Sequence, residues 1–239
     1  MVFSDLDQIK AQTRPSDWWT AYFLHPVSIR LVSILKDSRI TPNHLTLTGT
    51  LVVFGACALI CFGNRLSMLT AGLFLHISLV FDCADGQLAR YKHFESRLGE
   101  WLDRCTDKIK DFAIIYAFTL RYSQVNPNAW MFGFLCFFIL FFIDFLGFMN
   151  RLSPLLSTKE EALVEKKEAG LIKRLRVFKQ RINYSFFQIG EQYVAYTVFI
   201  IFNRIDLLFY FIISYGSLTI VWVILNIFRE IRLLTREER

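Results

Sequence analysis

The chain has 239 residues, 54% of them hydrophobic and 25 of them Phe, and its mean hydropathy is +0.38. This composition is too apolar for an ordinary soluble domain of this size and favours a polytopic membrane protein. The net charge of +6 does not call for a nucleic-acid partner, because Lys and Arg also gather in the cytoplasmic loops of membrane proteins.

The N-terminal segment predicts an amphipathic helix lying at the membrane interface. No cleavable signal peptide is expected, since the first forty residues carry charges throughout. Asp17 or Ser16 would cap the helix, and Pro26 would bend or divide it. An ordinary helix packed on a partner is the alternative. The apolar residues that recur at three- and four-residue steps are Trp18, Trp19, Tyr22, Phe23, Val27, Leu31, Ile34 and Leu35.

Six windows are long and apolar enough for a helix to cross a bilayer core, which takes roughly 20 residues. Thr41 is expected to cap the first helix, with Pro42 at its first position. We therefore predict an all-α polytopic fold with a cytoplasmic segment 1–40, a six-helix membrane domain 41–230 and a cytoplasmic tail 231–239. The predicted spans cover residues 43–62, 66–90, 96–120, 128–152, 183–203 and 206–229.

The basic residues between the spans are unevenly distributed. One side holds only Arg65, Arg121 and Arg204, whereas the other collects all the remaining loop and terminal Lys and Arg. By the positive-inside rule, both termini, the turn after Arg90 and the loop after the fourth span face the cytoplasm. Residues 157–180, rich in Lys and Glu, are expected to form a solvated helical connection on the membrane surface.

The five cysteines all fall within predicted spans and form no Cys-x-x-Cys pair, so we assign them to packing. They are Cys57, Cys61, Cys83, Cys105 and Cys136.

Charged residues within the second and third spans are the most informative anomaly, because intramembrane charge usually marks a polar cavity or pathway. Asp82 and Asp85 are three residues apart, and Gly86 and Ala89 continue the same helical face. Asp103 and Asp107 are four apart, with Gly99 one turn earlier. The short turn over residues 91–98 makes the two helices antiparallel neighbours, so all four carboxylates are expected at one depth.

Four carboxylates with no Cys or His ligand beside them favour Mg²⁺ or Mn²⁺ over zinc. Two such ions could clamp a phosphate between them. The alternative is a structural network in which these four aspartates and Asp111 pair with Arg104, Lys108 and Lys110. Burying such a network costs more than it returns unless its geometry is excellent.

In chain order these residues read Asp82-x-x-Asp85-Gly86-x-x-Ala89-Arg90, then eight residues, then Gly99-x-x-x-Asp103-x-x-x-Asp107. The pattern resembles the signature of the CDP-alcohol phosphotransferase family at every fixed position and spacing. The resemblance implies a membrane enzyme in which a CDP-linked donor and an alcohol acceptor give a phosphodiester and CMP. It also implies six spans and a homodimer.

Carried over by position, Asp82, Asp85, Asp103 and Asp107 would hold two divalent ions, Mg²⁺ or Mn²⁺. Asp107 would also act as general base on the acceptor hydroxyl. The resemblance further implies a CDP-donor site near the metals, with Gly86, Ala89 and Gly99 admitting the cytidine, Arg90 binding phosphate, and Asn43 near the nucleotide. Its residues would be Asn43, Asp82, Gly86, Ala89, Arg90 and Gly99.

Lys108 follows the last motif aspartate, as a basic residue does in relatives whose acceptor carries a phosphate. We therefore predict a phosphorylated polyol acceptor, such as inositol phosphate or glycerol phosphate, and CDP-diacylglycerol as donor. Lys108, Arg151 and Lys173 are acceptor-site candidates, with exposed surface charge as the alternative for Arg151 and Lys173. The chain is also similar to the di-inositol-phosphate phosphate synthases, whose donor is the soluble CDP-inositol.

Other polar residues in the spans have less definite expectations. Asp144, Glu191 and Gln192 are candidates for the acceptor pocket or a dimer contact, whereas His44 and His76 are equally well explained as packing residues.

Three other classes compete with this interpretation. Intramembrane prenyltransferases also bind Mg²⁺ through aspartates, but their two motifs lie far apart. A divalent-metal transporter would need carboxylates spread along a route through the membrane, and here they cluster near one cytoplasmic turn. A catalytically inactive scaffold is the third. The predicted location is the cytoplasmic membrane of a prokaryote, with the active site facing the cytoplasm.

Overall fold

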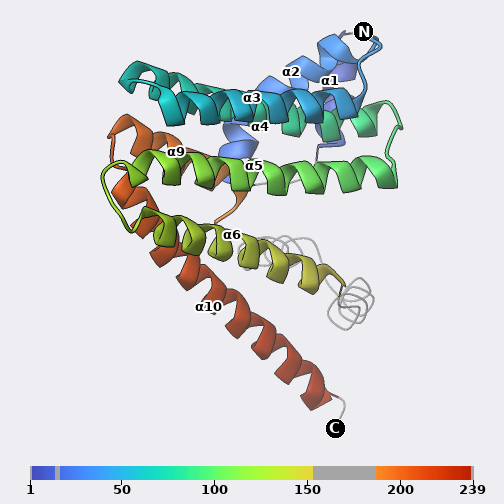
Figure 1. Cartoon of the computed structure of the whole chain (residues 1–239). Coiled ribbons are helices and arrows are strands. Elements are labelled where there is room, and N and C mark those ends of the chain that lie inside the picture. Colours follow the sequence, from blue (N-terminus) through green and yellow to red (C-terminus); the bar gives the residue numbers. More distant parts are fainter. Residues whose placement is uncertain (1, 14–16, 153–186, 238–239) are drawn as a thin grey trace. The chain divides into compact units, whose positions relative to one another are not determined.

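The computed structural model describes residues 2–13, 17–152 and 187–237, and every regular element in these ranges is a helix (Figure 1). The all-α prediction is therefore confirmed for the described part of the chain. The predicted connection over residues 157–180 lies outside it. The elements are α1 (Val2–Ala11), the π-helical turn η1 (Thr20–Leu24), α2 (His25–Leu35), α3 (Pro42–Phe62), α4 (Arg65–Tyr91), α5 (Arg97–Ser123), α6 (Ala129–Leu152), α9 (Ile189–Ile201) and α10 (Ile205–Glu237).

These helices belong to two compact units. Unit 1 comprises Met1–Phe134 and Ile189–Leu208, and unit 2 comprises Leu135–Gln188 and Phe209–Arg239. All residues of the Asp-rich signature lie in unit 1. Within unit 2, α6 and α10 pack closely, since a Cβ on Gly216 would lie 2.4 Å from Ile139 Cγ2. The domain boundaries at residues 40 and 230 stay a prediction.

In the described part of the chain, four helices are long and apolar enough to cross a membrane: Pro42–Phe62, Arg65–Tyr91, Ala129–Phe148 and Ile205–Arg229. They correspond to the first, second, fourth and sixth predicted spans. The third predicted span forms the 27-residue helix α5. This helix is long enough to cross a membrane, but its charged residues make it less apolar than the other four. The described part of the fifth is the 13-residue helix α9, so six crossings remain a prediction.

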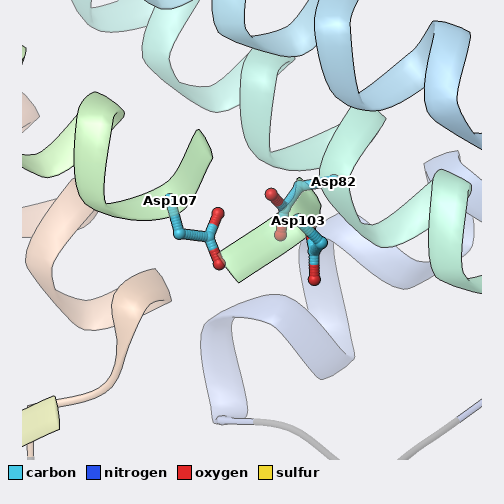
Figure 2. Close-up of side chains that lie close together, drawn as sticks. All are labelled: Asp82, Asp103 and Asp107. Carbon is cyan, nitrogen blue, oxygen red and sulfur yellow. The ribbon is translucent and has the colours of Figure 1, made fainter. Parts of the chain in front are cut away.

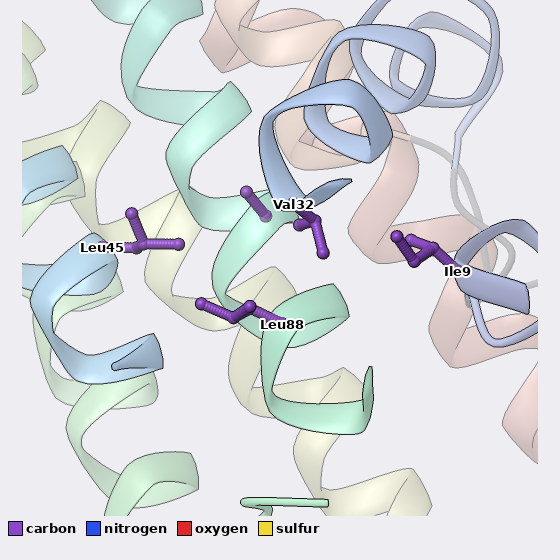
Figure 3. Close-up of a cluster of buried hydrophobic side chains, with 5 residues drawn as sticks. Ile9, Val32, Leu45 and Leu88 are labelled. Carbon is purple, nitrogen blue, oxygen red and sulfur yellow. The ribbon is translucent and has the colours of Figure 1, made fainter. Parts of the chain in front are cut away.

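The N-terminal helices pack on the membrane helices rather than standing apart. Ile9 of α1, Val32 of α2, Leu45 of α3 and Leu88 of α4 converge in one buried cluster with Ala84 (Figure 3). On the outer face, Trp18, Tyr22, Phe23, Val27 and Ile34 remain exposed. Of the predicted apolar stripe, Leu31 and Leu35 pack against the buried cluster, whereas these five residues form an exposed apolar face. Helix α1 was not predicted.

The local signals at the helix starts act as predicted. Asp17 Oδ1 accepts a hydrogen bond from the Thr20 backbone N–H, and the chain passes through the π-helical turn η1 just before Pro26. Proline has no N–H to continue the hydrogen-bond ladder, which accounts for the division at this point. Thr41 caps α3, and His44 completes a capping box by accepting from the Thr41 backbone N–H.

Helix α3 is the scaffold for the two motif helices because it packs on both α4 and α5, whereas the backbones of α4 and α5 scarcely approach each other (Figure 1). Its contact with α4 is tight: a Cβ on Gly49 would lie 3.3 Å from Phe81 Cβ. Asn43 and Gly99 are neighbours at one end of α3, and Gly63 and Arg121 are neighbours at the other, so α5 runs in the same direction as α3. Helix α4 follows α3 after a short turn and runs back along it. Helices α4 and α5 are therefore antiparallel, as predicted.

The connections of unit 1 gather at its two ends. Lys92 donates to the backbone oxygens of Ser38 and Ile40, which joins the turn after α4 to the segment before α3. At the other end, Arg121 donates to Gly63 and Arg65 donates to Ile201. The loops predicted for the non-cytoplasmic side thus lie together, away from the turn after α4.

Candidate active site

Three of the four signature aspartates meet between α4 and α5. Asp82 comes from α4, and Asp103 and Asp107 come from successive turns of α5 (Figure 2). One carboxylate oxygen from each can be chosen so that all three lie within 4.8 Å of one another, and each residue is half-buried. Helical spacing explains the arrangement, because residues three or four apart share a face. The convergence of the two helices at one acidic point is therefore confirmed.

Asp85 has a different immediate partner. It is buried, and its Oδ2 accepts a hydrogen bond from Thr46 Oγ1 of α3. Asp82 and Asp103 are among its electrostatic neighbours, but Asp85 does not belong to the three-carboxylate cluster. Of the four carboxylates expected in one shared site, three therefore meet, and the fourth accepts a hydrogen bond from α3.

The ammonium of Lys110 is the cation inside this cluster. Its Nζ donates to Asp82 Oδ1 and lies 2.7 Å from Asp107 Oδ1, while its side chain is only 3% exposed. Part of the alternative structural network therefore exists. Lys108 also pairs with an aspartate of that network, Asp111, whereas Arg104 pairs with Glu100 instead.

The glycines of the signature lie against polar side chains of their neighbours. A Cβ on Gly86 would lie 3.3 Å from the Arg90 guanidinium, so the arginine folds back over the glycine. A Cβ on Gly99 would lie 3.1 Å from Ser96 Oγ and 3.4 Å from Asn43 Oδ1. Asn43, Gly99 and Ala89 are all partly accessible. The predicted grouping of Asn43 with Gly99 is therefore present, and a nucleotide role for these residues stays a prediction.

The donor set fits a hard divalent cation. Asp82, Asp103 and Asp107 offer only carboxylate oxygens, which Mg²⁺ and Mn²⁺ prefer. Asp107 Oδ1 is buried and lies 2.7 Å from the Lys110 ammonium, which is its charged partner.

The acceptor candidates are less well defined. Lys108 is partly exposed beside Asp111. The side chain of Arg151 lies outside the described part of the chain, as does Lys173. Asp144 belongs to unit 2. Of the α9 candidates, Gln192 is buried and Glu191 is half-buried. His76 shares a 3.1 Å hydrogen bond with Thr197, in keeping with a packing role.

Two residues at the site were not predicted. Thr46 reaches Asp85 across helices, and no spacing rule distinguishes it from Thr50, which bonds back to its own helix. Tyr193 of α9 is almost completely buried, and its electrostatic neighbours include Lys110, Asp82 and Asp107. Only the fold brings α9 to this place, so the sequence offered no signal for it.

The chain belongs to the CDP-alcohol phosphatidyltransferase family, whose model matches residues 39–164. This range contains α3, α4, α5 and α6, and with them the whole Asp-rich signature. The family acts on CDP-linked donors and alcohol acceptors, and membership confirms the resemblance found in the signature.

Two of the similar proteins are named as synthases of lipid-linked inositol phosphates. The chain is 32% identical over 91 residues to an archaetidylinositol phosphate synthase of Pyrococcus horikoshii, covering 38% of this chain and 47% of that protein. It is 30% identical over 101 residues to a phosphatidylinositol phosphate synthase of Corynebacterium glutamicum, covering 41% and 45%.

A bifunctional IPC transferase and DIPP synthase of Aquifex aeolicus is 32% identical over 95 residues, covering 40% of this chain and 21% of that protein. The chain thus spans about half or less of the curated relatives it matches.

Proposed function

We propose that this chain transfers the substituted phosphate of CDP-diacylglycerol, or of a closely related CDP-linked lipid, to the hydroxyl of a phosphorylated polyol and releases CMP. Inositol phosphate and glycerol phosphate are the two acceptors we favour. The observation that carries this proposal is the meeting of Asp82, Asp103 and Asp107 on two antiparallel helices that match the family signature.

The metal ligands in this proposal are Asp82, Asp85, Asp103 and Asp107. Bound Mg²⁺ or Mn²⁺ would supply positive charge that stabilises the developing charge on phosphate and on departing CMP. Thr46 orients the Asp85 carboxylate through its hydroxyl. Gly86, Ala89 and Gly99 are proposed to admit the cytidine and Arg90 to bind phosphate, because Arg90 lies against Gly86 and Asn43 lies against Gly99.

Asp107 is the proposed general base. Its partly accessible carboxylate takes the proton of the acceptor hydroxyl as the new oxygen–phosphorus bond forms and the bond to CMP breaks. Lys108, which follows it on the same helix, is proposed to attract the acceptor's own phosphate.

The direct test is CMP release by purified full-length protein with Mn²⁺, CDP-diacylglycerol and a panel of phosphorylated and unphosphorylated polyols. We expect CMP with at least one phosphorylated polyol and little with its unphosphorylated form. Release with only unphosphorylated acceptors would contradict the proposed acceptor class. No CMP with any CDP-linked donor would favour a metal transporter or an inactive scaffold.

A soluble donor is the second candidate, and the match to bifunctional IPC transferase and DIPP synthases favours testing it. CDP-inositol therefore belongs in the same panel with inositol phosphate as acceptor. Turnover with CDP-inositol but not with CDP-diacylglycerol would show that the donor is a soluble CDP-alcohol.

We also propose six membrane crossings, with α5 and the segment ending in α9 as the third and fifth. The termini and active site would face the cytoplasm of a prokaryotic cell, and the enzyme would be a homodimer. The strongly uneven distribution of Lys and Arg supports the orientation. The dimer rests on family resemblance and is tested by the mass of the protein particle in detergent or nanodiscs.

A further inference from the structure

Lys110 is not part of the eight-position signature, yet it lies at the centre of the acidic cluster. It follows Asp107 by three residues, so both side chains project from the same face of α5. Its ammonium contacts Asp107 of its own helix and Asp82 of α4. The backbones of α4 and α5 scarcely approach each other, so this contact is a direct link between the two motif helices.

Burial of Lys110 strengthens the interaction of its charge with the neighbouring carboxylates. The side chain is 3% exposed, and the almost fully buried Tyr193 of α9 is among its electrostatic neighbours. Charges shielded from water are screened much less than surface charges. By contrast, the side chain of Lys108 is 37% exposed and contacts Asp111. Lys110 is therefore a fixed internal cation, and Lys108 is a more solvated one.

A fixed positive charge among metal-binding carboxylates has two opposite consequences. Asp82, Asp85, Asp103 and Asp107 together carry four negative charges when ionised, and Lys110 offsets one of them. It therefore weakens the attraction of the cluster for a divalent ion. Once the carboxylates are occupied by metal, the same charge increases the attraction of the site for an anionic pyrophosphate.

We propose that Lys110 is a positioning residue that holds Asp82 and Asp107 together across α4 and α5. Its positive charge lowers the affinity of the site for the metal and raises its affinity for the pyrophosphate of the donor. The inference rests on the proposed function, because it takes the carboxylates as metal ligands and a CDP-linked compound as donor. It predicts that removal of the charge changes the two affinities in opposite directions.

The experiment compares wild-type protein with Lys110→Met in nanodiscs and measures two dissociation constants. Mn²⁺ binding is followed by electron paramagnetic resonance, and CDP binding at saturating Mn²⁺ is followed by calorimetry. We expect Lys110→Met to bind Mn²⁺ more tightly and CDP more weakly, each by on the order of tenfold. Lys110→Arg should stay close to wild type in both.

Two further variants keep the test decisive. Lys110→Gln retains N–H donors but has no charge, so its two affinities should change as those of Lys110→Met do if the charge is the cause. If Lys110→Met does not fold, Lys110→Gln is measured in its place. Arg97→Met removes an exposed charge from the start of the same helix and should change both affinities by less than about threefold, because solvent screens that position.

The outcomes separate this inference from the proposed function. Failure of wild-type protein to bind Mn²⁺ or CDP would overturn the proposed function itself. If wild type binds both, parallel weakening of Mn²⁺ and CDP binding in Lys110→Met and Lys110→Gln would assign Lys110 a purely structural role. Unchanged affinities in both variants would also overturn the inference.

Discussion

At the scale of single residues, a substitution at Asp107 tests the catalytic step separately from binding of the donor. The Asp107 carboxylate lies in the cluster, and its buried Oδ1 lies 2.7 Å from the Lys110 ammonium. Asp107→Asn keeps the shape but removes the basic carboxylate. We expect turnover to fall by at least about 100-fold while the affinity for CDP stays largely unchanged, because general bases contribute that much or more to a rate.

Glu100→Gln is the matched control for Asp107→Asn. Glu100 lies on the same helix, is exposed and pairs with Arg104. CMP release by this variant should be near normal. Near-normal turnover in Asp107→Asn itself would refute the assignment of the general base.

Thr46 gives a second prediction at this scale. Its hydroxyl donates to the buried Asp85 carboxylate, and Thr46→Val removes that donor without changing the shape much. Loss of the partner of a buried carboxylate costs about 1–3 kcal/mol. We expect lower thermal stability and lower turnover, measured by heating the protein in detergent and by CMP release.

Thr50→Val is the control on the same helix. Thr50 is also buried, but its hydroxyl only bonds back to the Thr46 carbonyl. Its effect on turnover should be small. Equal losses in the two valine variants would show that the contact with Asp85 has no special role.

At the scale of elements, α9 approaches the N-terminal segment at Gly190. A Cβ there would lie 2.3 Å from Asp17 Oδ1 and 2.7 Å from Thr20 Oγ1. The Asp17 carboxylate cannot move freely, since it accepts from both the N–H and the hydroxyl of Thr20. Gly190→Ala should therefore destabilise the protein by about 1–3 kcal/mol, which thermal unfolding measures.

Gly147→Ala provides the comparison, because a Cβ at this helical position meets nothing within 4 Å. Alanine has the higher helix propensity, so this variant should be neutral or slightly more stable. Equal destabilisation by the two alanines would contradict the close approach at Gly190.

The sequence predicts local features better than contacts between helices. The caps at Asp17 and Thr41 and the division near Pro26 follow from side-chain chemistry within a few residues, and each was predicted. The meeting of Asp82 with Asp103 and Asp107 was predicted because a short turn joins two helices of known period. Thr46 and Tyr193 were missed, since their positions depend on the packing of α3 and α9.

At the scale of the whole molecule, the charged helix α5 is the main question of topology. Its ends lie at opposite ends of unit 1, near Asn43 and near Gly63. Several of its charges pair with one another or with Asp82, which lowers the cost of placing them at membrane depth. We therefore expect α5 to cross the membrane despite its low hydropathy.

Cysteine labelling tests this crossing. Phe94→Cys lies in the turn before α5 and Gln124→Cys directly follows it, and both positions are exposed. A membrane-impermeant maleimide should label Gln124→Cys in intact cells and Phe94→Cys only in inverted vesicles, with wild-type protein as background. Labelling of both from the same side would show that α5 does not cross.

The most direct test of the central claim is the position of Mn²⁺ in crystals of the full-length protein, located by anomalous scattering. The proposed function predicts Mn²⁺ bound by oxygens of Asp82, Asp103 and Asp107, and loss of the anomalous peak in Asp103→Asn. Mn²⁺ bound elsewhere, or a peak that is unchanged in Asp103→Asn, would contradict the assignment of these carboxylates as the metal centre.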